Sequence, residues 1–282
     1  MVGQRYMLRL EDFEMSLLLV PVSSLLPHEE IIPEFLERLA HAIEEDGVIK
    51  NPVIADANSL VVLDGNHRVE AFKKLGYGLI PVCLVDYRSP RIEVMCWYRT
   101  IEGRDHTRLA EVVDGFYSLS ANPKITAPID SANTLAVITE AGTIMFKPNG
   151  SLLEAYRALK ELETRLRDSG FEIGYSSEEG AFQRVQDGSL LGYIAMPPLT
   201  KEVIVEVAES GKRLPSKTSR HTLPARPMGV NFPLRLLGSG ADLEDASREF
   251  CGWLSQRHVT RMPPRSLYEE RLYYESLFVF HD

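Results

Sequence analysis

Apolar residues in the first hundred positions alternate between short extended runs and helical spacing. The run LLLVPVSSL (residues 17–25) predicts a strand, and residues 33–45 place apolar side chains on one face of a helix. Further elements are predicted over the extended segments 52–57 and 60–63, a helix over 69–75 and the strand LIPVCLVDY over 79–87. Strands separated by helices at this spacing predict a compact α/β unit.

A second group of elements follows a stretch of charged and small residues. It is predicted to contain a hairpin over 134–147 with its turn at 140–142, a helix over 152–167, strands over 171–175 and 190–196, and helices over 181–186 and 200–211. A helix over 243–256 and an aromatic strand over 267–280 end the pattern. The predicted domains are residues 1–115, residues 116–235, and an extension over residues 236–282 that packs on the second domain.

Composition supports a globular chain, and the order of the predicted elements supports the α/β (α+β) class. The 282 residues fit two ordinary domains, and 44% hydrophobic with 25% charged residues is close to globular averages. The formal net charge of −9 disfavours nucleic acid as a partner, because phosphate-backbone binding needs a surplus of basic groups.

Localisation and redox state can be inferred from the first apolar run and from the number and spacing of the cysteines. The apolar run at residues 16–22 falls far short of the roughly 20 residues that cross a bilayer, and no cleavage-site pattern accompanies it. Cys83, Cys96 and Cys251 are odd in number and widely spaced, which indicates reduced thiols. We therefore expect a cytoplasmic protein without a membrane partner.

The segment Asp64-Gly65-Asn66-His67-Arg68 ends a predicted strand and opens a predicted helix. A helix N-terminus offers unpaired N–H groups, Gly65 permits close backbone approach, and His67 and Arg68 add donors, so the segment predicts an anion pocket. The alternative is a capped turn in which Asp64 or Asn66 satisfies the helix start.

Several segments in series resemble the ParB/sulfiredoxin superfamily over about the first hundred residues. They are Pro27-His28-Glu29, the segment 52–57, VVLDGNHRVEAFKKLGY (61–77) and IPVCLVDY (80–87). The resemblance implies that residues 65–68 grip nucleotide phosphates. It also implies a ParB/sulfiredoxin-like N-terminal domain, a smaller α/β C-terminal domain and an active-site cleft between them.

Three activities occur in that superfamily, and the residues separate them. Sulfiredoxins need a cysteine where Asn66 stands. ParB partition proteins carry a DNA-binding region after the first domain, whereas the residues beyond 115 predict α/β alternation on an acidic chain. Free L-serine kinases remain: residues 171–224, including Thr218-Ser219-Arg220-His221, are similar to their second domain, and the tail over 230–282 resembles longer members associated with siderophore precursor synthesis.

The kinase resemblance implies a catalytic base. A serine hydroxyl is a poor nucleophile at neutral pH, so a nearby carboxylate is expected to accept its proton during attack on phosphorus. Glu29 matches the base of the family's Pro-His-Glu motif, whereas Glu30 is expected to favour the helix dipole. A structural role for Glu29 at the same helix start is the alternative.

The resemblance also implies the remaining site residues. ATP or ADP is expected at Pro52, Val53, Asp64, Gly65, Asn66, His67 and Arg68, with Mg²⁺ near Asp64. L-serine is expected at Trp97, Lys217, Thr218, Ser219, Arg220 and His221. The structural alternatives are a cap for Asp64, a core position for Trp97 and a polar interdomain loop for residues 216–221.

The predicted activity is the phosphorylation of free L-serine to O-phospho-L-serine. Two functions of other classes compete with it: a ParB-like DNA-binding or regulatory protein, and a nucleotide-sensing module without turnover. DNA mobility tests the first and serine-dependent nucleotide consumption tests the second.

Overall fold

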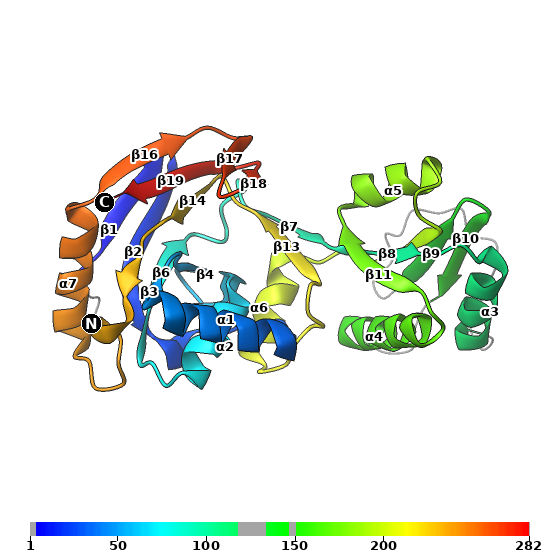
Figure 1. Ribbon diagram of the computed structural model, residues 1–282, viewed down its shortest axis with the longest axis horizontal. Coiled ribbons are helices and arrows are strands. Elements are labelled where there is room, and N and C mark those ends of the chain that lie inside the picture. Colours follow the sequence, from blue (N-terminus) through cyan, green and yellow to red (C-terminus); the bar gives the residue numbers. More distant parts are fainter. Residues whose placement is uncertain (1–3, 118–133, 147–150, 282) are drawn as a thin grey trace. The chain divides into compact units, whose positions relative to one another are not determined.

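The computed structural model describes residues 4–117, 134–146 and 151–281, which form two compact units (Figure 1). Unit 1 comprises Met1–Glu93, Lys201–Arg213 and His221–Asp282. Unit 2 comprises Val94–Thr200 and Leu214–Arg220. The chain therefore leaves unit 1 and returns to it twice.

These units divide the chain differently from the linear division into residues 1–115, 116–235 and 236–282. Segment 236–282 lies in unit 1, whereas we had expected it against the second domain. The physical reason is that its helix α7 (Leu243–Ser255) packs against β1 (Tyr6–Leu10) and β2 (Phe13–Pro21) near the start of the chain.

Unit 1 is built on a five-stranded mixed sheet of order β1-β2-β6-β4-β5. The other strands of this sheet are β6 (Leu79–Val85), β4 (Val53–Asp56) and β5 (Val62–Asp64). β4 and β6 run parallel, and the other pairs are antiparallel. Central β6 is almost wholly buried, as its continuous apolar sequence predicts. Helices α1 (Pro33–Asp46) and α2 (Asn66–Lys74) lie side by side (Figure 1).

The end of the chain adds a second sheet to unit 1, of order β14-β19-β16. Its strands are β14 (Ala225–Met228), β19 (Ser276–His281) and β16 (His258–Met262). The remaining elements of unit 1 are η1 (Val22–Ser24), β3 (Val48–Ile49), α6 (Lys201–Glu209), β15 (Phe232–Pro233), η2 (Leu234–Leu236), β17 (Ser266–Tyr268) and β18 (Arg271–Tyr273).

The single aromatic strand predicted over 267–280 is wrong. β17 and β18 form a hairpin, and β19 follows as a separate strand. Glu269 and Glu270 form the turn with positive φ angles of 46° and 61°. Two-residue hairpin turns with two positive φ angles normally carry Asn or Gly. The Glu-Glu sequence therefore does not predict a turn.

Unit 2 contains a five-stranded antiparallel sheet of order β10-β9-β12-β8-β11. The predicted hairpin is confirmed, because β9 pairs with β10. The strands of the sheet are β8 (Tyr98–Glu102), β9 (Leu135–Thr139), β10 (Gly142–Phe146), β11 (Glu172–Ser176) and β12 (Gly192–Ala195). The helices are α3 (His106–Tyr117), α4 (Leu152–Asp168) and α5 (Glu178–Gln186). A further pair joins β7 (Glu93–Cys96) to β13 (Ser219–Thr222).

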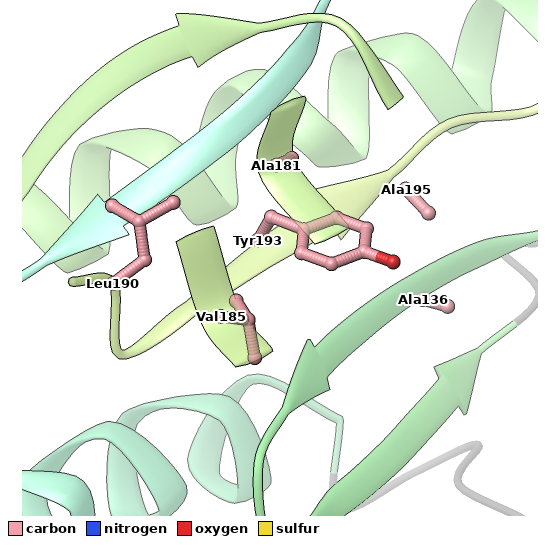
Figure 2. Packing of buried hydrophobic residues seen from close by; sticks show 6 residues of the cluster. All are labelled: Ala136, Ala181, Val185, Leu190, Tyr193 and Ala195. Atoms are coloured by element: carbon pink, nitrogen blue, oxygen red, sulfur yellow. The ribbon is translucent and has the colours of Figure 1, made fainter. Parts of the chain in front are cut away.

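Part of the core of unit 2 lies between α5 and the sheet (Figure 2). Its buried members are Ala136, Ala181, Val185, Leu190, Tyr193 and Ala195. Because side chains alternate across a strand, Tyr193 and Ala195 face α5 while Ile194 points to the opposite face of the sheet. On β8 the same alternation places Tyr98 against this cluster and turns Arg99 away from it.

The predicted α/β class is confirmed. Within the part of the chain that the structure describes, no helix combines the length and the apolar character needed to cross a membrane.

Candidate functional site

The predicted phosphate motif lies at the junction between β5 and α2 in unit 1. Gly65 occupies the N-cap position of α2 with φ of 106°, in the left-handed region that favours glycine. A Cβ atom at this position would lie 3.0 Å from the Nε and Nη2 atoms of Arg68. Glycine therefore leaves the face of this guanidinium open at the helix start.

Arg68 joins the helix start to the segment before β4. Its Nη1 donates to the carbonyl oxygens of Asn51, at 2.8 Å, and Pro52, at 2.6 Å, while Nη2 donates to Asp64 Oδ2 at 2.7 Å. Among the described residues, Nε has no hydrogen-bond partner. Arg68 thus fixes the buried residues Pro52 and Val53 relative to the motif and keeps a donor for a ligand.

Asp64 is bound by two guanidinium groups rather than one. Arg226 of β14 donates from Nη1 to Asp64 Oδ2 at 2.9 Å, and its Nε pairs with Glu275. Burial alone would raise the pKa of the Asp64 carboxyl, but Arg226 and Arg68 outweigh burial and hold this pKa well below its ordinary value. Sequence analysis missed Arg226 and Glu275, because no local pattern connects such distant positions; Arg226 lies 162 residues from Asp64.

The segment that carries Glu29 is fastened to the start of α2 on both sides. The backbone N–H of His28 donates to Asn66 Oδ1 at 3.1 Å, and the N–H of Ile32 donates to His67 Nε2 at 3.2 Å. Glu29 itself is buried, with 8% of its surface exposed. Asn66 and His67 therefore set the position of Glu29 beside the phosphate motif.

A buried aromatic cluster supports this segment. His221 Nε2 lies 2.8 Å from the Tyr87 hydroxyl, and its ring contacts that of His28 edge to face at 5.7 Å between centroids. Burial, reinforced by the neighbouring His28, lowers the pKa of His221 to about 3. His221 is therefore neutral at pH 7. It is assigned to unit 1, whereas residues 217–220 are assigned to unit 2, and its role in binding serine stays a prediction.

Unit 2 brings together Trp97 and the segment over residues 217–220. The N–H of Trp97 donates to the carbonyl of Thr218 at 3.0 Å, and the guanidinium carbon of Arg220 lies 5.0 Å from the centre of the Trp97 ring. Trp97 is half-buried, Thr218 is fully buried, and Lys217 is exposed with φ of 58°. The stacked pair Trp97–Arg220 offers a cation beside an aromatic face.

The residues present can be tested against a magnesium ion. No group of three or more His, Cys, Asp or Glu side chains within residues 4–117, 134–146 and 151–281 has the geometry of a metal site. The described hydrogen-bond partners of Asp64 bind Oδ2, which leaves Oδ1 available to a ligand. One carboxylate oxygen beside nucleotide phosphates fits Mg²⁺, which is commonly held by one or two carboxylates and the substrate.

Comparisons with known proteins find L-serine kinases and a ParB-like protein. No family model matches the chain. An ATP-dependent L-serine kinase of Staphylothermus marinus is 29% identical over 224 residues, which cover 77% of this chain and 89% of that protein. The ADP-dependent L-serine kinase SerK of Thermococcus kodakarensis is 22% identical over 223 residues, covering 77% and 91%. This chain is similar to the free L-serine kinases.

The resemblance predicted from the motifs is thereby confirmed. A solved structure of a free serine kinase in complex with AMP matches with a TM-score of 0.67 at 23% identity, covering 78% of this chain and 93% of that one. At this identity the match shows that the fold is shared with free serine kinases. The roles of individual residues stay predictions.

Proposed function

We propose that the protein transfers a phosphoryl group from ATP or ADP to the hydroxyl of free L-serine and forms O-phospho-L-serine. The observation that carries the proposal is the attachment of the Glu29 segment to the first residues of α2 through Asn66 and His67. This attachment places a buried carboxylate next to the helix start that is expected to hold the phosphates.

The donor nucleotide is assigned to unit 1. The N–H groups at the start of α2 and the Nε–H of Arg68 would bind its phosphate oxygens, because both are donors aimed at the Gly65 opening. Pro52 and Val53 would contact the base of the nucleotide. When bound, Mg²⁺ would be held by Asp64 and would neutralise charge on the phosphates.

The transfer can be written with its atoms balanced. The serine hydroxyl oxygen forms a bond to the terminal phosphorus, the bond from that phosphorus to the bridging oxygen of the nucleotide breaks, and Glu29 accepts the hydroxyl proton. ATP would leave as ADP, or ADP as AMP. Trp97, Lys217, Thr218, Ser219 and Arg220 of unit 2 would bind the serine, with Arg220 opposite its carboxylate.

The experiment that tests the function supplies the protein with L-serine, Mg²⁺ and either ATP or ADP. We expect O-phospho-L-serine by mass spectrometry, and the nucleotide product identifies the donor. L-threonine and D-serine serve as substrate controls. Nucleotide binding without serine-dependent consumption of either donor would instead indicate a sensing module.

DNA binding is the second function to test, because a ParB-like protein of Sulfolobus acidocaldarius is 29% identical over 207 residues. The net charge of −9 disfavours it. We expect no sequence-preferring shift of DNA mobility at 150 mM salt.

A further inference from the structure

Arg99 is the largest fully buried side chain in the described part of the molecule, with 1% of its side chain exposed. It lies on β8 of unit 2, on the face of the sheet turned away from α5. A buried guanidinium is costly unless its N–H groups are paired, and replacing such an ion pair by apolar residues is often neutral for stability. Its presence therefore calls for a role beyond stability.

The contacts of Arg99 converge on two main-chain segments. Nε donates to Glu163 of α4 at 2.5 Å, and Nη1 donates to the carbonyls of Trp97, at 2.9 Å, and Lys217, at 2.8 Å. Nη2 donates to the carbonyl of Ser216 at 3.2 Å. Only a planar guanidinium fork can reach a carboxylate and three carbonyls at once, so a lysine would not replace it.

The main chain that Arg99 holds is strained. Lys217 adopts φ of 58°, which is unfavourable for a residue with a side chain. Such conformations persist when surrounding contacts over-determine them. Arg99 binds the Lys217 carbonyl, and the Trp97 N–H binds the Thr218 carbonyl at 3.0 Å on the other side of the strained peptide.

The main-chain segments that Arg99 holds also carry two side chains assigned to L-serine binding, Trp97 and Arg220. Trp97 lies two residues before Arg99 on the chain, and Arg220 follows the held segment and stacks on Trp97 with 5.0 Å between its guanidinium carbon and the ring centre. Movement of either main-chain segment would therefore separate this pair.

We propose that Arg99, with Glu163 as its charge partner, is a positioning residue for L-serine: it fixes Trp97 and the segment over 216–220 in the geometry that binds the amino acid. The inference rests on the proposed function. Because the nucleotide is assigned to unit 1, the loss of Arg99 is expected to act on serine alone.

The test replaces the ion pair without leaving a buried charge, in the double variant Arg99→Met/Glu163→Met. Arg99→Lys is the second variant, because it keeps a charge opposite Glu163 and loses the fork. The matched control is Arg184→Met/Glu102→Met, since that pair lies in the same unit at 3.0 Å with side chains 42% and 43% exposed. All are made in a Trp253→Phe background, which leaves Trp97 as the single tryptophan.

We expect the KM for serine to rise about 10–100-fold in both Arg99 variants, while nucleotide Kd measured by calorimetry changes less than twofold. Trp97 emission should shift because its contact with Arg220 is lost, and the control pair should change neither quantity. A folded Arg99 variant with wild-type serine KM and wild-type Trp97 emission overturns the inference while the kinase function stands. If the wild-type protein phosphorylates no serine, the proposed function fails, and unchanged Trp97 emission in the variants overturns the positioning role by itself.

Discussion

Arg68 in unit 1 and Arg99 in unit 2 each join a carboxylate to main-chain carbonyls. In unit 1, Arg68 binds Asp64 and the carbonyls of residues 51 and 52. In unit 2, Arg99 binds Glu163 and the carbonyls of Trp97, Ser216 and Lys217. The Arg68 side chain is 19% exposed and that of Arg99 is 1% exposed.

The difference in exposure separates two tasks. Arg68 stands at the Gly65 opening and keeps Nε for a ligand, so it both builds the site and is expected to bind in it. Arg99 is enclosed and acts only on other residues. An arginine whose hydrogen bonds hold the main chain can therefore also be a binding residue. The position of its remaining donor decides whether it can reach a ligand.

The largest effect is expected at Glu29, which tests whether unit 1 carries the chemistry as well as the donor. Glu29→Gln keeps the size of the side chain but cannot accept the hydroxyl proton. Turnover should fall about 10²–10⁴-fold, with nucleotide and serine affinities changed modestly. Steady-state rates and calorimetry measure both.

Glu30→Gln is the matched control, since Glu30 is the neighbouring carboxylate and is less buried. It should be nearly silent. Near-normal turnover in Glu29→Gln would place the base elsewhere, or show that a loose transition state needs none.

Removing the arginine of unit 1 should have the next largest effect. Arg68→Ala removes a charged donor and releases the carbonyls of Asn51 and Pro52. Nucleotide binding should weaken by about 1.5–3 kcal/mol, which is roughly 10–150-fold, as measured by calorimetry. Lys73→Ala, on the exposed side of α2, should leave binding unchanged. Unchanged affinity in a folded Arg68→Ala protein contradicts the assignment of the motif.

A smaller effect, confined to unit 2, is expected for Arg220→Ala. Loss of the cation stacked on Trp97 should raise the KM for serine about tenfold, because a partly exposed charge pair with the substrate carboxylate is lost. Nucleotide affinity in the absence of serine should stay the same. Arg165→Ala, a half-exposed position on α4, is the control. Collapse of nucleotide binding alone would assign Arg220 to the donor instead.

The last prediction concerns stability, not catalysis, and the buried histidines of unit 1. Burial lowers the pKa of His28 and lowers that of His221 to about 3, so the unfolded chain binds protons below pH 6.5 that the folded protein does not. Stability contributed by the neutral rings is present above pH 6.5 and is lost as pH falls towards the folded values. The unfolding free energy should decrease by up to about 1.4 kcal/mol per pH unit for each ring.

Urea unfolding at pH 6.5, 5.5 and 4.5 measures this slope. His221→Gln should reduce it, whereas His281→Gln, at an exposed position, should not. Equal slopes in all three proteins would show that His221 titrates normally.

Local patterns were sufficient for the motif and insufficient for the framework around it. The Asp64–Arg68 segment was predicted because a strand end, a glycine and a helix start follow one another in sequence. Arg226 and Arg99 were missed because their partners lie up to 162 and 118 residues away, and nothing in a single sequence connects such positions.

The prediction of helices and strands shows the same limit of local sequence patterns. The apolar periodicity predicted α1 and α4, whereas β7 and β8 lie in a mixed-polarity stretch and were not predicted. Buried Arg99 itself interrupts the apolar pattern of β8. The residue that holds the segment over 216–220 is therefore also the reason why the pattern did not predict this strand.

The packing of α7 against β1 and β2 has a consequence for biosynthesis. The five strands of the first sheet have all been translated once Val85 is made, but α7 begins about 160 residues later. At ordinary elongation rates, roughly 10–30 s pass between the synthesis of this sheet and the synthesis of α7, which covers its apolar face. Nascent chains of this protein therefore carry an uncovered sheet on the ribosome, and slower translation should lower their soluble yield.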